Sequence, residues 1–127
     1  MNPSEAPRKP SLQSIVPILP VRDMDASVAF YQRLGFNAKP YADGLNQYVF
    51  LVMDGLSMHL GLSSAPEFQF NPCGVYFYVR EADALYRRLV DAGVPCLFPP
   101  ADKPWGLREF AVSDPDQTLL RFGELLE

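Results

Sequence analysis

The sequence is short of the residues that build metal centres and disulfide frameworks: it has one histidine, His59, and two cysteines, Cys73 and Cys96. The two cysteines do not form a metal-type pair, and reduced thiols in a cytosolic protein are the simplest interpretation. Basic residues are also outnumbered by acidic ones, 11 to 15, and the formal net charge of −4 disfavours a nucleic-acid partner. An acidic protein weakly favours cationic ligands instead.

Long apolar runs are absent as well, so no membrane partner is expected. Residues 1–10 hold three prolines and several polar residues, and they lack the apolar region of a signal peptide. We expect residues 1–11 to form a flexible tail. Residues 12–127 are long enough to bury one core, and 48% hydrophobic content is ordinary for one globular domain.

Turn and cap signals divide the remaining chain into two similar halves. In residues 12–63 they predict a strand at 12–21, a helix capped by Asp23 or Asp25 and ended by Gly35, and strands at 36–41, 45–53 and 56–62. The pairs Asp43-Gly44 and Asp54-Gly55 are typical of hairpin turns. Pro17 and Pro20 favour an edge or exchanged position for the first strand.

The second half repeats this order after a polar link at residues 63–72. A strand at 74–79 precedes a helix at 82–92 that Gly93 ends, and strands follow at 94–98, 107–112 and 118–122. Residues 114–117 have the chemistry of a type I turn, with Asp first and Pro second. Val21 and Val79 precede their helices, and Gly35 and Gly93 end them, each pair 58 residues apart. This spacing indicates an internal repeat and two modules that build one cleft.

Periodicity assigns faces to these elements. Helical stripes are expected at Val28, Tyr31 and Leu34, and at Ala82, Leu85, Tyr86, Leu89 and Val90. The strand residues expected to pack on the helices are Met58, Leu60, Leu62, Val75, Phe77, Val79, Leu120 and Phe122. The opposite faces carry His59, Tyr76, Tyr78 and Arg121, and we predict that these line a concave ligand site. The alternative is a second packing surface, such as a dimer interface.

Two segments give the chain a family resemblance. Residues 21–36 (VRDMDASVAFYQRLGF) and residues 114–122 (DPDQTLLRF) resemble the vicinal-oxygen-chelate superfamily, which includes glyoxalase I, extradiol dioxygenases and the fosfomycin and bleomycin resistance proteins. The resemblance implies an α+β fold in which two βαβββ modules, about residues 12–63 and 73–124, form a curved mixed sheet around a cleft, commonly in a homodimer. Gln117 stands where the superfamily usually has glycine.

The positions of the metal ligands in the superfamily indicate which of its branches this chain resembles. In this chain they fall on Val16, His59, Gly74 and Arg121, of which only His59 could bind a metal. A catalytic metal needs about three protein ligands, so no metal and no other cofactor is expected. The alternative is a metal-dependent glyoxalase-like lyase or dioxygenase with a non-standard site that draws on Glu109 or Asp116.

The bleomycin-resistance branch resembles the chain more closely. Residues 16–19 (VPIL) are similar to the N-terminal segment of that branch, where proline marks the hinge of an exchanged arm, which implies Pro17 here. Residues 104–111 (PWGLREFA) resemble its tryptophan loop and following strand, with one residue extra relative to some members. Phe36 and Tyr41 fall where members carry aromatics that hold the flat bithiazole of the drug.

The resemblance therefore implies a protein that sequesters bleomycin, or a similar aromatic and cationic ligand, without chemistry. Aromatic stacking contributes about 0.5–1.5 kcal/mol per pair beyond area burial. Acidic side chains at the cleft rim would attract the cationic end of the ligand, and the candidates are Asp43, Asp54 and Glu109.

Each candidate residue also has a structural interpretation. Trp105 is either a stacking residue or a loop anchor, and Phe36 and Tyr41 are either ligand contacts or core. His59 is expected to line the cleft as a hydrogen-bonding group, and Arg121 either binds an anion or pairs with an acidic neighbour. Tyr76 and Tyr78 either line the cleft or seal a dimer.

Overall fold

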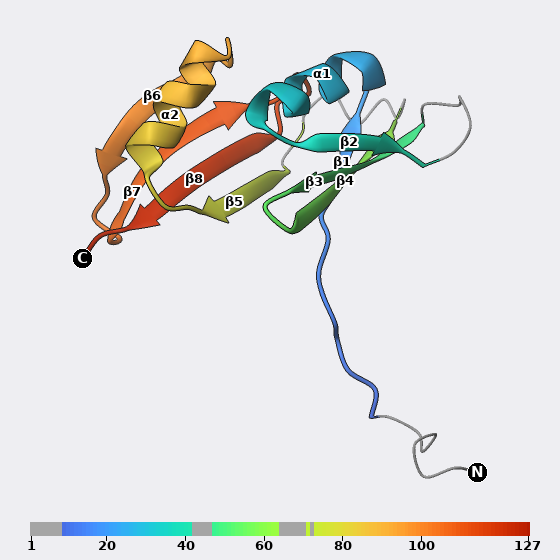
Figure 1. The fold of residues 1–127 in the computed structure, drawn as a ribbon, viewed down its shortest axis with the longest axis horizontal. Coiled ribbons are helices and arrows are strands. Elements are labelled where there is room, and N and C mark those ends of the chain that lie inside the picture. The colour runs from blue at the N-terminus through green and yellow to red at the C-terminus, as the bar shows by residue number, and fades with distance from the viewer. Residues whose placement is uncertain (1–8, 42–46, 64–70, 72) are drawn as a thin grey trace.

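The protein consists of two four-stranded sheets, each covered by one helix on the same side (Figure 1). The computed structural model describes residues 9–41, 47–63, 71 and 73–127. The first module contains β1 (Ile18–Val21), α1 (Met24–Leu34), β2 (Asn37–Pro40), β3 (Tyr48–Met53) and β4 (Leu56–Leu62). The second contains β5 (Gly74–Tyr78), α2 (Ala82–Asp91), β6 (Cys96–Asp102), β7 (Leu107–Ser113) and β8 (Leu119–Leu125). In the described part of the chain, no helix has the length and apolarity to cross a membrane.

The predicted repeat is confirmed at the level of strand order and helix ends. The sheets have the orders β1-β4-β3-β2 and β5-β8-β7-β6, so that the first strand of each module runs parallel to its last. The two helices begin at Met24 and Ala82, again 58 residues apart. Gly35 and Gly93 follow the helices with φ of +118° and +82°, the left-handed region that glycine enters without steric cost.

The core lies between the helices and the facing sides of both sheets, as the periodicity predicted. Tyr31 and Leu34 of α1 and Leu89 of α2 are buried there. Phe77, Phe110 and Phe122 form a stack with ring centroids 4.9 and 5.0 Å apart, and Phe36 of the first module contacts Phe77 at 6.4 Å. The expectation was wrong at two positions: Val90 and Leu62 are exposed, and each lies at or next to the end of its element.

Several predicted strand limits differ from the structure. The first strand was expected at 12–21, but pairing begins only at Ile18, opposite His59, since the residues before it have no neighbouring strand in the described chain. The strand expected at 94–98 instead runs from Cys96 to Asp102, because an edge strand with register shifts accommodates Pro99 and Pro100. β8 likewise continues to Leu125. The Asp43-Gly44 turn and most of the 63–72 link lie outside the described residues.

The predicted turn at residues 114–117 forms and also joins the two modules. The Gln117 N–H donates to the Asp114 carbonyl at 2.9 Å, and Gln117 takes φ of +66°, which explains why glycine is usual at this position in the superfamily. The Asp114 carboxylate accepts from the backbone N–H groups of Asp116 and Thr118 at 2.8 and 2.9 Å. It also accepts from the Tyr31 hydroxyl of the first module at 2.7 Å.

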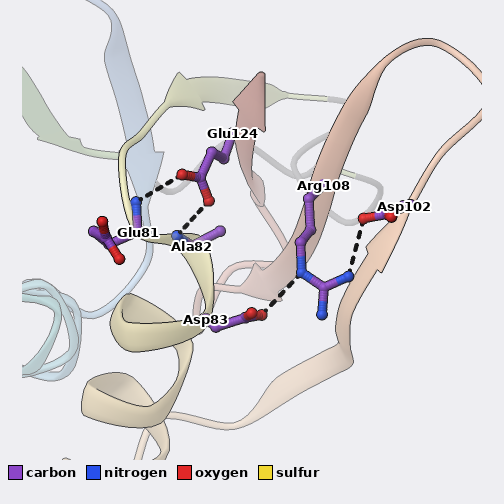
Figure 2. Close-up of polar contacts among 6 residues, drawn as sticks. All are labelled: Glu81, Ala82, Asp83, Asp102, Arg108 and Glu124. Carbon is purple, nitrogen blue, oxygen red and sulfur yellow. Dashed lines mark hydrogen bonds and ion pairs between the residues drawn. The ribbon is translucent and has the colours of Figure 1, made fainter. Parts of the chain in front are cut away.

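The N-terminus of α2 is capped by a side chain from a distant strand. Glu81 precedes the helix with φ of +58° and makes no side-chain cap of its own. Figure 2 shows that the Glu124 carboxylate, from β8, accepts instead from the backbone N–H groups of Glu81 and Ala82, at 3.2 and 3.0 Å. On the same side, Arg108 bridges Asp83 of α2 to Asp102 of β6, with both distances 3.0 Å. These contacts fix α2 against its sheet.

Replacing Glu124 by alanine is expected to destabilise the fold by about 1 kcal/mol, the usual cost of losing a helix cap. The reason is that two N–H groups at the helix start lose their acceptor. The measurement is urea unfolding followed by far-UV circular dichroism, with Glu127→Ala as the control because Glu127 is exposed at the chain end. Equal unfolding midpoints for the two variants would contradict the capping role.

Candidate functional site

The sheet face turned away from the helices carries a buried carboxylate in the second module. Glu109 of β7 is only 1% exposed, and its Oε1 accepts from the Tyr76 hydroxyl at 2.8 Å and from Trp105 Nε1 at 3.3 Å. Its Oε2 lies 3.5 Å from Arg121 Nη1. We call Glu109, Tyr76, Trp105 and Arg121 the Glu109 cluster. Arg121 therefore pairs with an acidic neighbour, one of the two interpretations of its sequence position.

Tyr76 crosses the sheet above a glycine. A methyl group built on Gly123 would lie 2.0 Å from the Tyr76 hydroxyl oxygen, so the bare backbone there makes the ring position possible. Burial, followed by the hydrogen bond and negative charge of Glu109, raises the pKa of Tyr76 to about 12. Tyr76 therefore stays protonated and donates to Glu109 at any physiological pH.

The corresponding face of the first module carries rings. We call Tyr41, Tyr48, Phe50 and His59 the first-module aromatic cluster. The His59 ring lies 4.7 Å from Phe50 and 5.3 Å from Tyr48, and the Tyr48 hydroxyl contacts His59 Nδ1 at 2.8 Å. Tyr41 contacts Phe50 edge-to-face at 5.9 Å and is largely exposed. The cluster is therefore packed on its sheet side and open on the other.

Strand register shows that the two clusters occupy equivalent places. Tyr48 lies opposite Gly61 in the first sheet, and Glu109 lies opposite Gly123 in the second. His59 and Arg121 likewise both stand on the last strand, beside the first strand of their module. The polar pair Tyr48–His59 in one module thus corresponds to Glu109–Arg121 in the other.

Six of the seven predicted ligand residues lie in or beside these clusters, and one does not. His59 and Tyr41 belong to the first, and Tyr76, Trp105 and Arg121 to the second. Tyr78 is exposed, with its ring 5.2 Å from that of Tyr76. Phe36 instead is buried on the helix side, in the core, where it also lines a cleft of about 830 Å³ between the modules.

The predicted rim acids are distributed differently from expectation. Glu109 is not at a rim, because it is buried and already bonded to three side chains. Asp54 borders the helix-side cleft together with Arg80 and Arg88, and it belongs to neither cluster. Asp43 lies outside the described residues.

Sequence reasoning missed two rings of the first-module aromatic cluster, Tyr48 and Phe50. The signal was present, since Val49 and Leu51 are the buried residues of β3 and strand alternation turns Tyr48 and Phe50 to the other face. The run from Tyr48 to Met53 consists of large hydrophobic residues, so its alternation is not visible from residue type alone.

The donor set does not fit the metal of the superfamily's enzymes. Of the four ligand positions, only His59 has a metal-binding side chain, and its Nδ1 contacts Tyr48. Arg121 occupies a second of the four ligand positions, and its positive charge would repel a metal ion there. Within the described ranges, no group of three His, Cys, Asp or Glu side chains is close enough to hold a metal ion.

The architecture is that of the glyoxalase and bleomycin-resistance class of paired βαβββ proteins. The sequence model of the Glyoxalase/Bleomycin resistance protein/Dioxygenase superfamily matches residues 11–122, and the chain belongs to that superfamily. A bleomycin resistance protein of Geobacillus stearothermophilus is 31% identical over 131 residues, which cover 87% of this chain and 95% of the relative.

Among the solved structures that share the fold are two of bleomycin-related proteins. The bleomycin resistance determinant encoded on transposon Tn5 is 25% identical, with a TM-score of 0.76 over 90% of this chain and 98% of the other. A bleomycin-binding protein in complex with bleomycin is 26% identical, with a TM-score of 0.73 over 89% of this chain and 98% of the other.

Proposed function

We propose that this protein binds bleomycin, or a ligand with the same flat aromatic and cationic parts, and gives resistance by sequestering it. The observation that carries the proposal is Trp105, which is 58% exposed while its ring nitrogen is anchored to Glu109. An anchored ring with a free face is suited to stacking on a planar heteroaromatic group. The net charge of −4 favours the approach of a cationic ligand. Similarity to a protein solved with bleomycin supports this ligand.

We propose further that the ligand site is completed by a second copy of the chain. The β6–β7 connection, which carries Trp105, and the end of β2, next to Tyr41, lie at opposite ends of the molecule (Figure 1). Trp105 and Tyr41 of one chain therefore do not face each other, whereas Trp105 of one chain and the first-module aromatic cluster of a partner could form two walls of one crevice. Tyr41, Tyr78 and Trp105 are large and exposed, and exposed apolar area of this kind supports an interface.

Exchange of the N-terminal arm is part of this dimer proposal. The carbonyl of Pro17 accepts from the His59 N–H at 2.9 Å, and the chain before it makes no strand pairing. Residues 9–17 extend away from the sheets, with Leu12 and Ile15 fully or almost fully exposed (Figure 1). An extended apolar segment of this kind is suited to a partner's sheet edge. A cytosolic location also belongs to this proposal.

The test is calorimetric titration of the purified protein with bleomycin, alongside the fluorescence of Trp105. We expect saturable heat and quenching at micromolar protein, and about tenfold or more weaker binding in Trp105→Ala because stacking and ring burial are lost. Leu97→Ala is the control, since Leu97 is an equally exposed apolar residue on the preceding strand.

No heat and no quenching in the wild type would exclude bleomycin as the ligand. A divalent metal recovered in one-to-one ratio with the chain, and activity lost on chelation, would instead favour an enzyme of the superfamily. Sedimentation equilibrium with Tyr41→Ala, the exposed ring of the first-module aromatic cluster, tests the second copy separately. A wild-type monomer that binds bleomycin at full affinity would remove the dimer from the proposal.

A further inference from the structure

Glu109 is an unusual residue for its position. A carboxylate that is only 1% exposed is costly to bury, and it is retained only where hydrogen bonds and charges compensate. The equivalent position in the first module is Tyr48, so the fold itself does not require an acid there. All three partners of Glu109 lie on the face opposite the helices, not in the core.

We propose that Glu109 is a positioning residue for Trp105: it holds the edge of the indole so that the ring face is presented to the ligand. The inference deepens the proposed function, because it assigns the residue that orients the stacking side chain of that site. The orientation of the indole does not depend on the ligand, because the bond from Trp105 to Glu109 forms within the chain itself.

The surroundings of Trp105 leave this hydrogen bond as its main restraint. Trp105 is 58% exposed, and among the described residues the one hydrogen bond of its ring is the bond to Glu109. The backbone of the loop is tight, with the Gly106 N–H donating to the Lys103 carbonyl at 3.1 Å and Gly106 at φ of +85°. The tight backbone fixes the position of the Trp105 Cα and Cβ atoms, and the hydrogen bond from Nε1 to Glu109 fixes the far edge of the ring.

The carboxylate is itself held in place. Tyr76 donates to the same oxygen that accepts from Trp105, and Arg121 lies near the other oxygen. Because an acceptor fixed on both oxygens cannot rotate freely, the indole has one preferred orientation. A hydrogen bond to an anion also polarises the ring, which favours cationic or electron-poor aromatic ligands on its face.

Orientation before binding has a measurable consequence. A side chain that must be immobilised on binding lowers affinity, whereas one already fixed does not. Loss of the Glu109 acceptor is therefore expected to weaken bleomycin binding about two- to tenfold, the effect of immobilising one side chain.

The experiment uses Trp105 as its own probe, because it is the only tryptophan of the chain. The fluorescence anisotropy decay of the unliganded protein is expected to show a fixed indole in the wild type and a fast local motion in Glu109→Leu. Glu109→Gln keeps an acceptor oxygen and is expected to restore most of the wild-type decay. Asp102→Asn is the matched control, since Asp102 is an exposed acid on the same β6–β7 hairpin that contacts Arg108 and not the indole.

A second measurement needs no variant. The single indole N–H resonance of the wild type is expected to exchange slowly with water, as a hydrogen-bonded group does. Rapid exchange, or an anisotropy decay unchanged in folded Glu109→Leu, would overturn the positioning role whatever the affinity. If the wild-type protein fails to bind bleomycin but its indole is rigid, bleomycin is excluded as the ligand and the positioning role of Glu109 is retained.

Discussion

Gly123→Ala is expected to destabilise the protein by about 2 kcal/mol, whereas Gly61→Ala, the equivalent change in the first module, is expected to have little effect. A methyl group on Gly123 would lie 2.0 Å from the Tyr76 hydroxyl and 2.8 Å from Cζ of the same ring. The ring must therefore leave its place and lose its hydrogen bond to Glu109, and a hydrogen bond to a charged group contributes about 1.5–3 kcal/mol. On Gly61 the nearest atom would be Tyr48 Cε2 at 3.7 Å, an ordinary contact.

Two measurements separate this explanation from general overpacking. Urea unfolding gives the difference in stability between the two alanine variants. Absorbance titration of the tyrosines, with Tyr76→Phe used to assign the signal, gives the pKa of Tyr76, which is expected to return from about 12 towards its ordinary value of 10.0 in Gly123→Ala only. Equal stabilities of the two alanine variants, or a Tyr76 whose pKa stays near 12 in Gly123→Ala, would contradict the placement of Tyr76 over the glycine.

The parts of the fold that sequence reasoning predicts well are those set by local chemistry. Gly35 and Gly93 end helices because only glycine enters the left-handed region freely, and the spacing between them reveals the repeat. Alternation in β4 and β8 separates the core side chains Leu60 and Leu120 from His59 and Arg121 on the other face. These signals depend only on neighbours in the chain, so they can be read without a structure.

The parts that sequence reasoning could not predict depend on residues distant in the chain. The partners of Glu109 come from β5, β8 and a loop, and nothing in the run around it distinguishes a buried acid from one at a cleft rim. The cap of α2 likewise comes from Glu124, 42 positions after the Ala82 N–H that it accepts. Phe36 follows a helix-ending glycine, and its burial between Tyr31 and Phe77 shows that it belongs to the core.

Asp114→Ala is expected to have the largest effect on stability, about 4 kcal/mol. The change removes the acceptor for the Tyr31 hydroxyl, which is fully buried, and for the backbone N–H groups of Asp116 and Thr118. Each buried donor left without a partner costs about 1–3 kcal/mol, and these costs do not add fully. The bond from Tyr31 connects α1 of the first module to the β7–β8 turn of the second, so we expect the variant to loosen the contact between modules.

Asp114→Asn is the matched control, because it keeps the size of the side chain and an acceptor oxygen but removes the charge. Burial raises the pKa of the Asp114 carboxyl above its ordinary value of 3.8, so the folded state binds its proton at a higher pH than the unfolded state. Stability from this group is therefore highest when it is protonated and falls as pH rises from 3.8 through the raised value. Urea unfolding across mildly acidic pH should show this decline in the wild type relative to Asp114→Asn. If the free energy of unfolding depends on pH in the same way in both proteins, ionisation of the buried Asp114 carboxyl does not lower stability.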